Sequence, residues 1–337
     1  MFQSTPQFSI KTEEDPEEIL KWLYIGTEIP IWPEFFQYII HDLKMFQAKS
    51  ILLTENGNIT GNVLLFNEND EILYFGFFGV LNHNKKKISF LLNSIIEYGK
   101  LNKFSKIIGP VNIPTFIYGW GFMEEGSEAS VFIGKPINPP IYQELFFHKG
   151  FTLKTKELSL EGPVIKLNSK VLKSFTPENY ELFNPKSWEE VLSFKPTFYK
   201  LKSNLPSESV ITPGTQHLYE NYVNFVKTYG DLFLIVFLKY KITGDIIGCF
   251  FSIPNPFRKN KSDIYDSCEA FLILLEKEHQ GKGLGWLLSL FTAKKGWDNN
   301  MRYTSSPIEK NTKRSIRITK RYGLEHKRTH LILEYLI

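Results

Sequence analysis

The chain carries the same local pattern twice, once in each half. Residues 82–90 read NHNKKKISF, and residues 278–286 read EHQGKGLGW. In each copy an apolar run comes first, a histidine and an amide residue follow, and a Leu-Leu pair comes next. Because a repeated pattern indicates a repeated structural unit, the chain should fold as two copies of one domain.

Three further pairs of segments match in the same order along the chain: 58–66 with 241–250, 107–111 with 304–308, and 148–151 with 321–324. Each copy therefore predicts a hairpin, a strand, a loop, a helix, a strand, a helix and a final strand. The length of 337 residues fits two domains. A Gly-Pro pair in LEGPVIKLNSK places the boundary between a first domain at 1–162 and a second at 163–337.

A glycine-rich turn separates a predicted strand from a predicted helix in the second copy. The apolar segment 268–278, CEAFLILLEKE, predicts a buried strand, and LGWLLSLFTAKKGW has apolar residues at helical spacing. The turn at 280–285 therefore stands at a helix N-terminus, where free N–H groups and the helix dipole attract anions. Glycines let the backbone approach such an anion without a Cβ atom in the way.

The spacing of the glycines narrows the type of anion site. The phosphate-loop pattern G-x-x-x-x-G-K-[ST] is absent, and Trp286 occupies the last glycine of the dinucleotide pattern G-x-G-x-x-G. What remains is [QR]-x-x-G-x-[GA], with Gln280, Gly283 and Gly285 at the fixed positions. This turn between strand and helix resembles the pyrophosphate loop of the GNAT N-acetyltransferase superfamily, which binds acetyl-CoA. The resemblance covers residues 225–337 well, and the first half resembles the same fold in a diverged copy.

The resemblance implies an α+β fold with two GNAT-like domains in tandem, each a mostly antiparallel central sheet flanked by helices. It further implies an acyl-CoA-dependent N-acyltransferase. Acetyl-CoA or another acyl-CoA would be the co-substrate, and an amine of a small molecule or peptide would be the acceptor. The second domain would bind CoA, and a backbone N–H near Leu275 would polarise the developing oxyanion. The implied cofactor contacts are Leu275, Gln280, Gly281, Lys282, Gly283, Leu284, Gly285 and Asn311.

The catalytic residues that the resemblance implies are only partly present. Many members of the superfamily place a general-acid tyrosine four residues before a Gly-aromatic turn, where this chain has Thr319. Tyr322 adjoins the glycine and is the substitute candidate, although a tyrosine there often serves for packing alone. Candidate general bases are Glu269, Glu276 and Glu309, because a dry site raises the pKa of a carboxyl group toward neutrality.

The first copy has lysines where the second has glycines. Lys85 and Lys87 take the places of Gly281 and Gly283. Their Cβ atoms should crowd a loop whose N–H groups have to face a phosphate. We expect a degenerate copy, kept for packing or as one wall of a substrate pocket. Retained cofactor binding and a different anion are the alternatives.

Composition argues against several other classes of protein. The net charge of +4 is too small to indicate nucleic-acid binding, and two cysteines cannot form a disulfide framework. No apolar run approaches the roughly 20 residues that span a membrane, and the first residues lack the pattern of a signal peptide. We expect a cytoplasmic protein without a metal site, because the sequence has no metal-ligand cluster.

Two alternative functions remain open. A non-catalytic CoA-sensing or scaffold protein would explain both the missing tyrosine and the degenerate copy. A tandem-GNAT transferase that takes an aminoacyl group from tRNA fits less well. That chemistry needs no CoA loop, and RNA binding usually brings a strongly basic surface.

Overall fold

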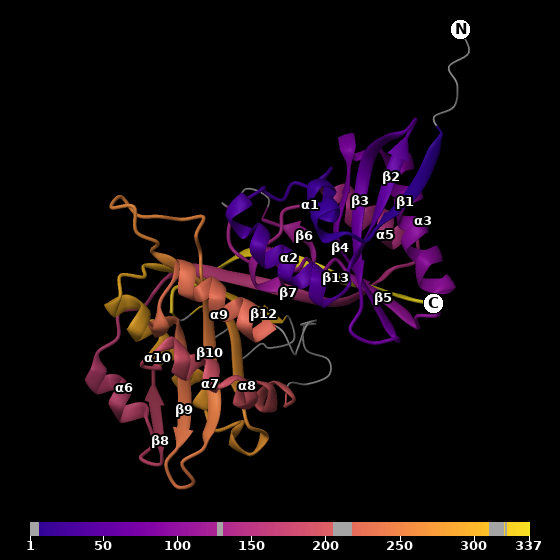
Figure 1. The fold of residues 1–337 in the computed structure, drawn as a ribbon. Coiled ribbons are helices and arrows are strands. Elements are labelled where there is room, and N and C mark those ends of the chain that lie inside the picture. Colours follow the sequence, from indigo (N-terminus) through magenta and orange to yellow (C-terminus); the bar gives the residue numbers. More distant parts are fainter. Residues whose placement is uncertain (1–6, 127–130, 205–217, 310–319, 321) are drawn as a thin grey trace. The chain divides into compact units, whose positions relative to one another are not determined.

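The structure is a computed structural model that describes residues 7–126, 131–204, 218–309, 320 and 322–337 (Figure 1). The contacts among these residues divide them into two compact units. Unit 1 contains the residues up to Glu157 together with Arg328–Ile337, and unit 2 contains Leu158 to Lys327. Because the chain returns to unit 1 at its end, unit 1 consists of two separate stretches of sequence.

Unit 1 is built on a sheet with the strand order β1-β2-β3-β4-β5-β13, and β6 also pairs with β13. Strands β4 and β5 run parallel, and the other described pairs of this unit are antiparallel. In Figure 1 the yellow end of the chain, β13, lies beside β5, where Leu333 stands opposite Gly109. The strands are β1 (Phe8–Glu13), β2 (Lys49–Glu55), β3 (Asn58–Phe66), β4 (Ile72–Val80), β5 (Lys106–Gly109), β6 (Phe122–Glu125) and β13 (Glu325–Leu336).

The helices of unit 1 bury apolar faces against this sheet. In α3, Ile88, Leu91, Leu92 and Ile95 are all buried, at the spacing of one helix face. Burying a side chain of this size contributes roughly 1.5–3 kcal/mol. The helices are α1 (Pro16–Trp22), η1 (Pro33–Phe35), α2 (Phe36–Met45), η2 (Leu81–His83), α3 (Lys85–Leu101), α4 (Thr115–Tyr118) and α5 (Pro140–His148).

Unit 2 contains parallel and antiparallel strands in the order β8-β9-β10-β11-β12-β7. Its central strands β11 and β12 run parallel, whereas β8, β9, β10 and β11 pair in antiparallel fashion. The chain passes from unit 1 to unit 2 within β7. The strands are β7 (Thr152–Pro163), β8 (Tyr180–Phe183), β9 (Ile235–Tyr240), β10 (Ile246–Pro254), β11 (Ser267–Leu275) and β12 (Tyr303–Glu309).

Helix α10 packs on this sheet as α3 does in unit 1. Leu284, Leu287 and Leu288 of α10 join a buried cluster with Val236 of β9 and Phe250 of β10. The helices of unit 2 are α6 (Ser169–Phe175), α7 (Trp188–Ser193), α8 (Lys195–Lys202), α9 (Leu218–Tyr229), η3 (Leu232–Leu234), η4 (Lys277–His279) and α10 (Leu284–Asp298).

The two units repeat one succession of elements. Hairpin β2–β3, strand β4, helix α3 and strand β5 follow each other in unit 1, as β9–β10, β11, α10 and β12 do in unit 2. In both, the strand before the helix and the strand after it are parallel neighbours. The predicted α+β fold with a repeated, mostly antiparallel sheet is thus confirmed. Among the helices that the structure describes, none is long and apolar enough to cross a membrane.

Candidate functional site

Strand β11 is the central strand of unit 2, and its two halves differ in burial. Ser267–Glu269 is buried and pairs with Tyr303–Ser305 of β12. The described register with β12 ends there, and most of Ala270–Leu275 is half-buried, with Ile273 40% exposed. Because an apolar strand inside a parallel pair is normally covered on both faces, this exposure indicates that the sheet opens between β11 and β12.

A cavity of about 520 Å³ occupies this part of unit 2. Its walls come from β10, β11, β12, α10 and residues 163–165. A volume of this size falls within the range of small-molecule pockets, which is roughly 300–1,000 Å³. The lining residues include Ala270 and Ile273 of β11, Ser306 and Ile308 of β12, and Gly285 and Trp286 of α10.

The glycine-rich turn leads into this cavity at the start of α10. Gly281 and Gly283 have φ values of +77° and +81°, which glycine adopts far more readily than other residues. A Cβ atom added to either would meet no heavy atom within 4 Å, so the space above the turn is open. Among the described residues, no side chain caps the helix N-terminus at Gly283. The N–H groups of the first turn, which includes Gly285 in the cavity wall, are therefore available to an anionic ligand.

The main chain of β11 has polar groups on the side turned away from β10, and Ile273 on this stretch lines the cavity. The Nε2 atom of Gln280 donates to the carbonyl oxygen of Leu275 at 3.1 Å, while the N–H of Glu276 donates to Ile247 of β10 at 2.8 Å. Since main-chain groups alternate in direction along a strand, those of Leu275 and Ile273 face away from β10. An extended ligand lying along this edge could pair with them as an additional strand does.

Two of the three carboxylate candidates, Glu269 and Glu276, lie outside the cavity wall. Glu269 is buried on β11, but its neighbours Cys268 and Ala270 line the cavity, and alternation places Glu269 on the opposite face of the sheet. Glu276 accepts a hydrogen bond from the Nζ atom of Lys200 at 2.6 Å, and this ion pair is at the surface of α8. Neither carboxylate therefore faces the opening directly.

Tyr322 does line the cavity. Its ring packs against Trp286, with 4.6 Å between ring centroids. The structure thus brings Tyr322 to the same wall as the start of α10. Asn311, Thr319 and the side chain of Glu309 lie outside the part of the chain that the structure describes.

Sequence reasoning missed the residues that line the inner part of the cavity. A signal for them exists in α10, because Gly285, Ser289, Ala293 and Gly296 place small residues along one helix face. Small side chains on this face of α10 leave space beside the helix unfilled, and the cavity occupies that space. The missed polar residues are Ser252 of β10, Cys268 of β11, Thr292 of α10 and Thr304 of β12.

The N-terminus of α3 in unit 1 is closed by its own sequence. The Oδ1 atom of Asn84 accepts hydrogen bonds from the N–H groups of Lys86 at 3.0 Å and Lys87 at 3.3 Å. The side chain of Lys87 is buried in an ion pair with Glu55 at 2.8 Å. The difference from α10 therefore comes from a side-chain cap that satisfies the first turn. Lys85 and Lys87, which were expected in a loop from the sequence, belong to α3 itself.

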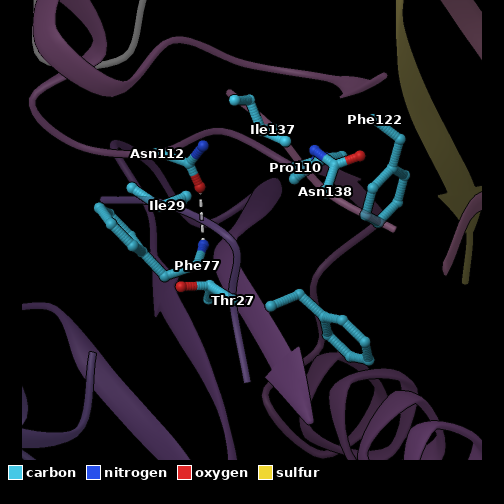
Figure 2. A pocket seen from close by; sticks show the side chains of 9 residues that line it. Thr27, Ile29, Phe77, Pro110, Asn112, Phe122, Ile137 and Asn138 are labelled. Carbon is cyan, nitrogen blue, oxygen red and sulfur yellow. Dashed lines mark hydrogen bonds between the residues drawn. The ribbon is translucent and has the colours of Figure 1, made fainter. Parts of the chain in front are cut away.

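In unit 1, by contrast with unit 2, the space between the parallel strands β4 and β5 is filled. Strand β4 is buried from Leu73 to Val80, and the corresponding space measures about 10 Å³, which is about the size of one water molecule. Figure 2 shows the reason: the Oδ1 atom of Asn112 accepts a hydrogen bond from the N–H of Phe77 at 2.7 Å. The Nδ2 atom of Asn112 donates to the carbonyl oxygen of Tyr118 at 3.2 Å. A side-chain amide thus takes up the N–H of Phe77, so this main-chain donor of β4 is not available to a ligand.

The histidines of the two matching segments hold their loops in place. The Nδ1 atom of His279 lies 3.1 Å from the hydroxyl of Tyr180, and that of His83 lies 3.1 Å from the hydroxyl of Tyr142. Each ring also contacts its tyrosine edge to face. The same geometry occurs in unit 2, beside the cavity of about 520 Å³, and in unit 1, where the described space is about 10 Å³. This repetition supports a structural role for both histidines.

Asn84→Ala should lower the free energy of unfolding of unit 1 by about 1 kcal/mol, because two N–H groups lose their acceptor. Urea denaturation measures this change. CoA affinity, measured by calorimetry on the same variant, should stay within twofold of the original. A variant of unchanged stability would show that the cap contributes nothing, and a loss of CoA affinity would connect unit 1 to the ligand.

Solved structures with the same fold extend over the whole chain. A tandem GNAT protein from the clavulanic acid biosynthesis pathway has a TM-score of 0.60 at 11% identity, with 98% of both chains covered. A GCN5-related N-acetyltransferase from Sphaerobacter thermophilus has a TM-score of 0.56 at 10% identity, covering 98% of this chain and 95% of the other. A conserved protein from Enterococcus faecalis, described as a probable N-acyltransferase, has a TM-score of 0.61 at 9% identity, covering 98% of this chain and 73% of the other.

No family model and no curated protein matches the sequence. The structural likeness nevertheless shows that the chain has the tandem GNAT fold, as the glycine-rich turn and the internal repeat implied.

Proposed function

We propose that unit 2 binds acyl-CoA and transfers the acyl group to an amine. The proposal rests on one observation, which is that the glycine-rich turn, the cavity and the edge of β11 adjoin one another. An uncapped glycine turn leads into a cavity of about 520 Å³, and the main-chain edge of β11 faces that cavity. The turn suits a pyrophosphate, the edge suits the amide groups of a pantetheine arm, and the cavity suits the thioester.

The described residues suggest how such a transfer proceeds. The N–H of Ile273 or Leu275 stabilises the negative charge that develops on the thioester oxygen when the amine nitrogen attacks the carbonyl carbon. A carboxylate accepts the amine proton through water, for which Glu276 at the end of β11 is the remaining candidate, because Glu269 is on the opposite face of the sheet. The carbon–sulfur bond then breaks, and the Tyr322 hydroxyl, which is in the cavity wall, donates a proton to the leaving thiolate.

A non-catalytic CoA-binding protein is the second candidate. One observation favours it: Glu276 is held in an ion pair with Lys200, and Glu269 is on the sheet face opposite the cavity. Such a protein would bind CoA and acyl-CoA equally well and release no thiol. The same path from turn to cavity would then serve recognition alone.

Two measurements on the full chain separate these functions. Calorimetry with CoA and acetyl-CoA tests binding, and a thiol-release assay with a panel of amines tests transfer. The protein's own thiols should not interfere, because burial raises the pKa of Cys268 to about 12 and that of Cys249 further still. Absence of CoA binding contradicts the proposal, while binding without thiol release with any amine favours the second candidate.

Tyr322→Phe should lower kcat by a factor of about 100 while changing the Kd for acyl-CoA less than twofold, because a general acid contributes roughly 10²–10⁴ to the rate. The phenylalanine ring keeps the contact with Trp286. The matched control is Tyr303→Phe, since Tyr303 is a partly buried tyrosine on β12 that lies outside the cavity wall. An unchanged kcat in Tyr322→Phe would leave Tyr322 with a packing role only.

A further inference from the structure

The cavity of unit 2 continues beyond the point where β11 and β12 separate. Cys268 and Thr304 stand opposite each other in the closed, paired part of the sheet, yet both line the cavity. Ser252 lines it as well, although β10 lies on the far side of β11 from β12. The cavity therefore extends beneath α10, across the sheet face that this helix covers.

The small residues of α10 account for this space. Gly285, Ser289, Ala293 and Gly296 all line the cavity and recur every three or four residues. Over this stretch the helix rises about 16 Å. Gly285 is at the glycine-rich turn, and Gly296 is at the inner end, where an added Cβ atom would lie 3.9 Å from Val164. The stripe thus runs from the turn to the inner end of the cavity.

Two buried hydroxyl groups in the cavity wall have no hydrogen-bond partner within the described part of the chain. Ser252 is fully buried and Thr292 is 8% exposed. A buried hydroxyl without a partner costs free energy that an apolar residue in its place would not. Both side chains line the cavity, so an oxygen atom of a bound ligand can complete them.

We propose that the acyl group is longer than acetyl and carries a hydroxyl or carbonyl oxygen along its chain. The chain lies beneath α10, and its oxygen hydrogen-bonds with Ser252 and Thr292. The inference rests on the proposed CoA site, which puts the thioester at the opening near Ala270. An acetyl group ends at that opening and leaves the space between Ser252 and Gly296 empty.

Calorimetric titration of the full chain tests the inference with four ligands: CoA, acetyl-CoA, hexanoyl-CoA and 3-hydroxyhexanoyl-CoA. Hexanoyl-CoA should bind at least tenfold more tightly than acetyl-CoA, because its methylene groups leave water for an apolar cavity. 3-Hydroxyhexanoyl-CoA should bind about fivefold more tightly again, because its hydroxyl hydrogen-bonds with the hydroxyls of Ser252 and Thr292, which have no partner among the described residues.

Variants show which residues produce the gain in affinity from the longer chain and which produce the gain from the hydroxyl. Ala293→Phe fills the inner cavity and should abolish the tenfold gain of hexanoyl-CoA over acetyl-CoA. The ratio of these two dissociation constants within one variant is the readout, so a general loss of stability does not imitate the effect. Ser252→Ala and Thr292→Val should remove the gain from the hydroxyl and keep the gain from the chain. Ser159→Ala is the matched control, because Ser159 is also fully buried without a described partner but does not line the cavity.

These measurements distinguish a failure of the inference from a failure of the proposed function. If CoA binds and hexanoyl-CoA binds no more tightly than acetyl-CoA, the inference is overturned and the proposed function stands. If the longer chain binds more tightly but the hydroxyl adds nothing, or if Ser159→Ala removes its gain as well, the role of Ser252 and Thr292 is overturned. If no form of CoA binds, the proposed function fails, and the inference fails with it.

Discussion

Gly283→Val should weaken CoA binding by a factor of at least 100. Gly283 has a φ of +81°, a conformation that a β-branched residue adopts only at a considerable cost in free energy. The turn must therefore rearrange, and its N–H groups lose their common direction. Each hydrogen bond from such a group to a charged phosphate contributes about 1.5–3 kcal/mol, so losing two of them corresponds to a factor of 100 or more in Kd. Calorimetry with CoA measures this change.

The matched control for this substitution is Gly244→Val. Gly244 also has a φ of +81°, and a Cβ atom there also meets nothing within 4 Å. It lies in the turn between β9 and β10, away from the cavity. This variant should lose a similar amount of stability and keep its affinity for CoA. Equal losses of affinity in both variants would show that the effect of Gly283→Val is a general loss of structure.

Lys87→Val tests the assignment of the site to unit 2. This substitution removes the ion pair with Glu55 and should lower the stability of unit 1. CoA affinity should change less than twofold, since the first turn of α3 is capped by Asn84. If Lys87→Val weakens CoA binding and Gly283→Val does not, the site is in unit 1.

The stability of unit 1 should fall as the pH drops below 6.5, because of His330. This histidine is buried on β13, its Nε2 atom lies 3.0 Å from the carbonyl oxygen of Pro136, and its Nδ1 atom has no partner among the described residues. Burial, together with the charges of Lys135 and Arg328, lowers the pKa of His330 from 6.5 to about 3. The imidazole therefore stays neutral in the folded state when the pH falls below 6.5, until it approaches about 3.

The direction of the effect follows from the two pKa values. Between pH 6.5 and about 3 the unfolded chain binds a proton at His330 that the folded chain does not, so the free energy of unfolding decreases as the pH falls. The slope approaches 1.4 kcal/mol per pH unit for one proton. Above pH 6.5 both states are neutral at this position and the contribution is complete.

Urea denaturation between pH 7.5 and 5 isolates this slope, because ordinary carboxylates titrate mainly below that range. His330→Gln keeps a donor for Pro136 and removes the titrating group, so its stability should change little over the same interval. His148→Gln is the control, since the side chain of His148 is exposed and should leave the slope as it was. A slope that persists in His330→Gln would have to come from another group.

Local sequence determined the repeated elements and the position of the glycine-rich turn. The apolar spacing of α10, the alternation in the strands and the glycines at 281, 283 and 285 each act over a few neighbouring residues. These features therefore predicted the strand, turn and helix of unit 2 before any contact between distant residues was known. The same reasoning predicted that unit 1 has a different helix N-terminus, although it named the lysines and overlooked Asn84.

Contacts between residues far apart in the sequence decided the remaining features of the fold and of the candidate site. The last strand, β13, pairs with β5 of unit 1, although the two strands are far apart in the sequence. The filling of unit 1 depends on Asn112 reaching the N–H of Phe77, and the cavity of unit 2 depends on small residues of α10 lying above Ser252 of β10. No periodicity encodes such contacts, because packing depends on which side chains the folded backbone brings together. The sequence by itself determined where a ligand loop could form, and the tertiary structure decided which of the two units has an open space behind it.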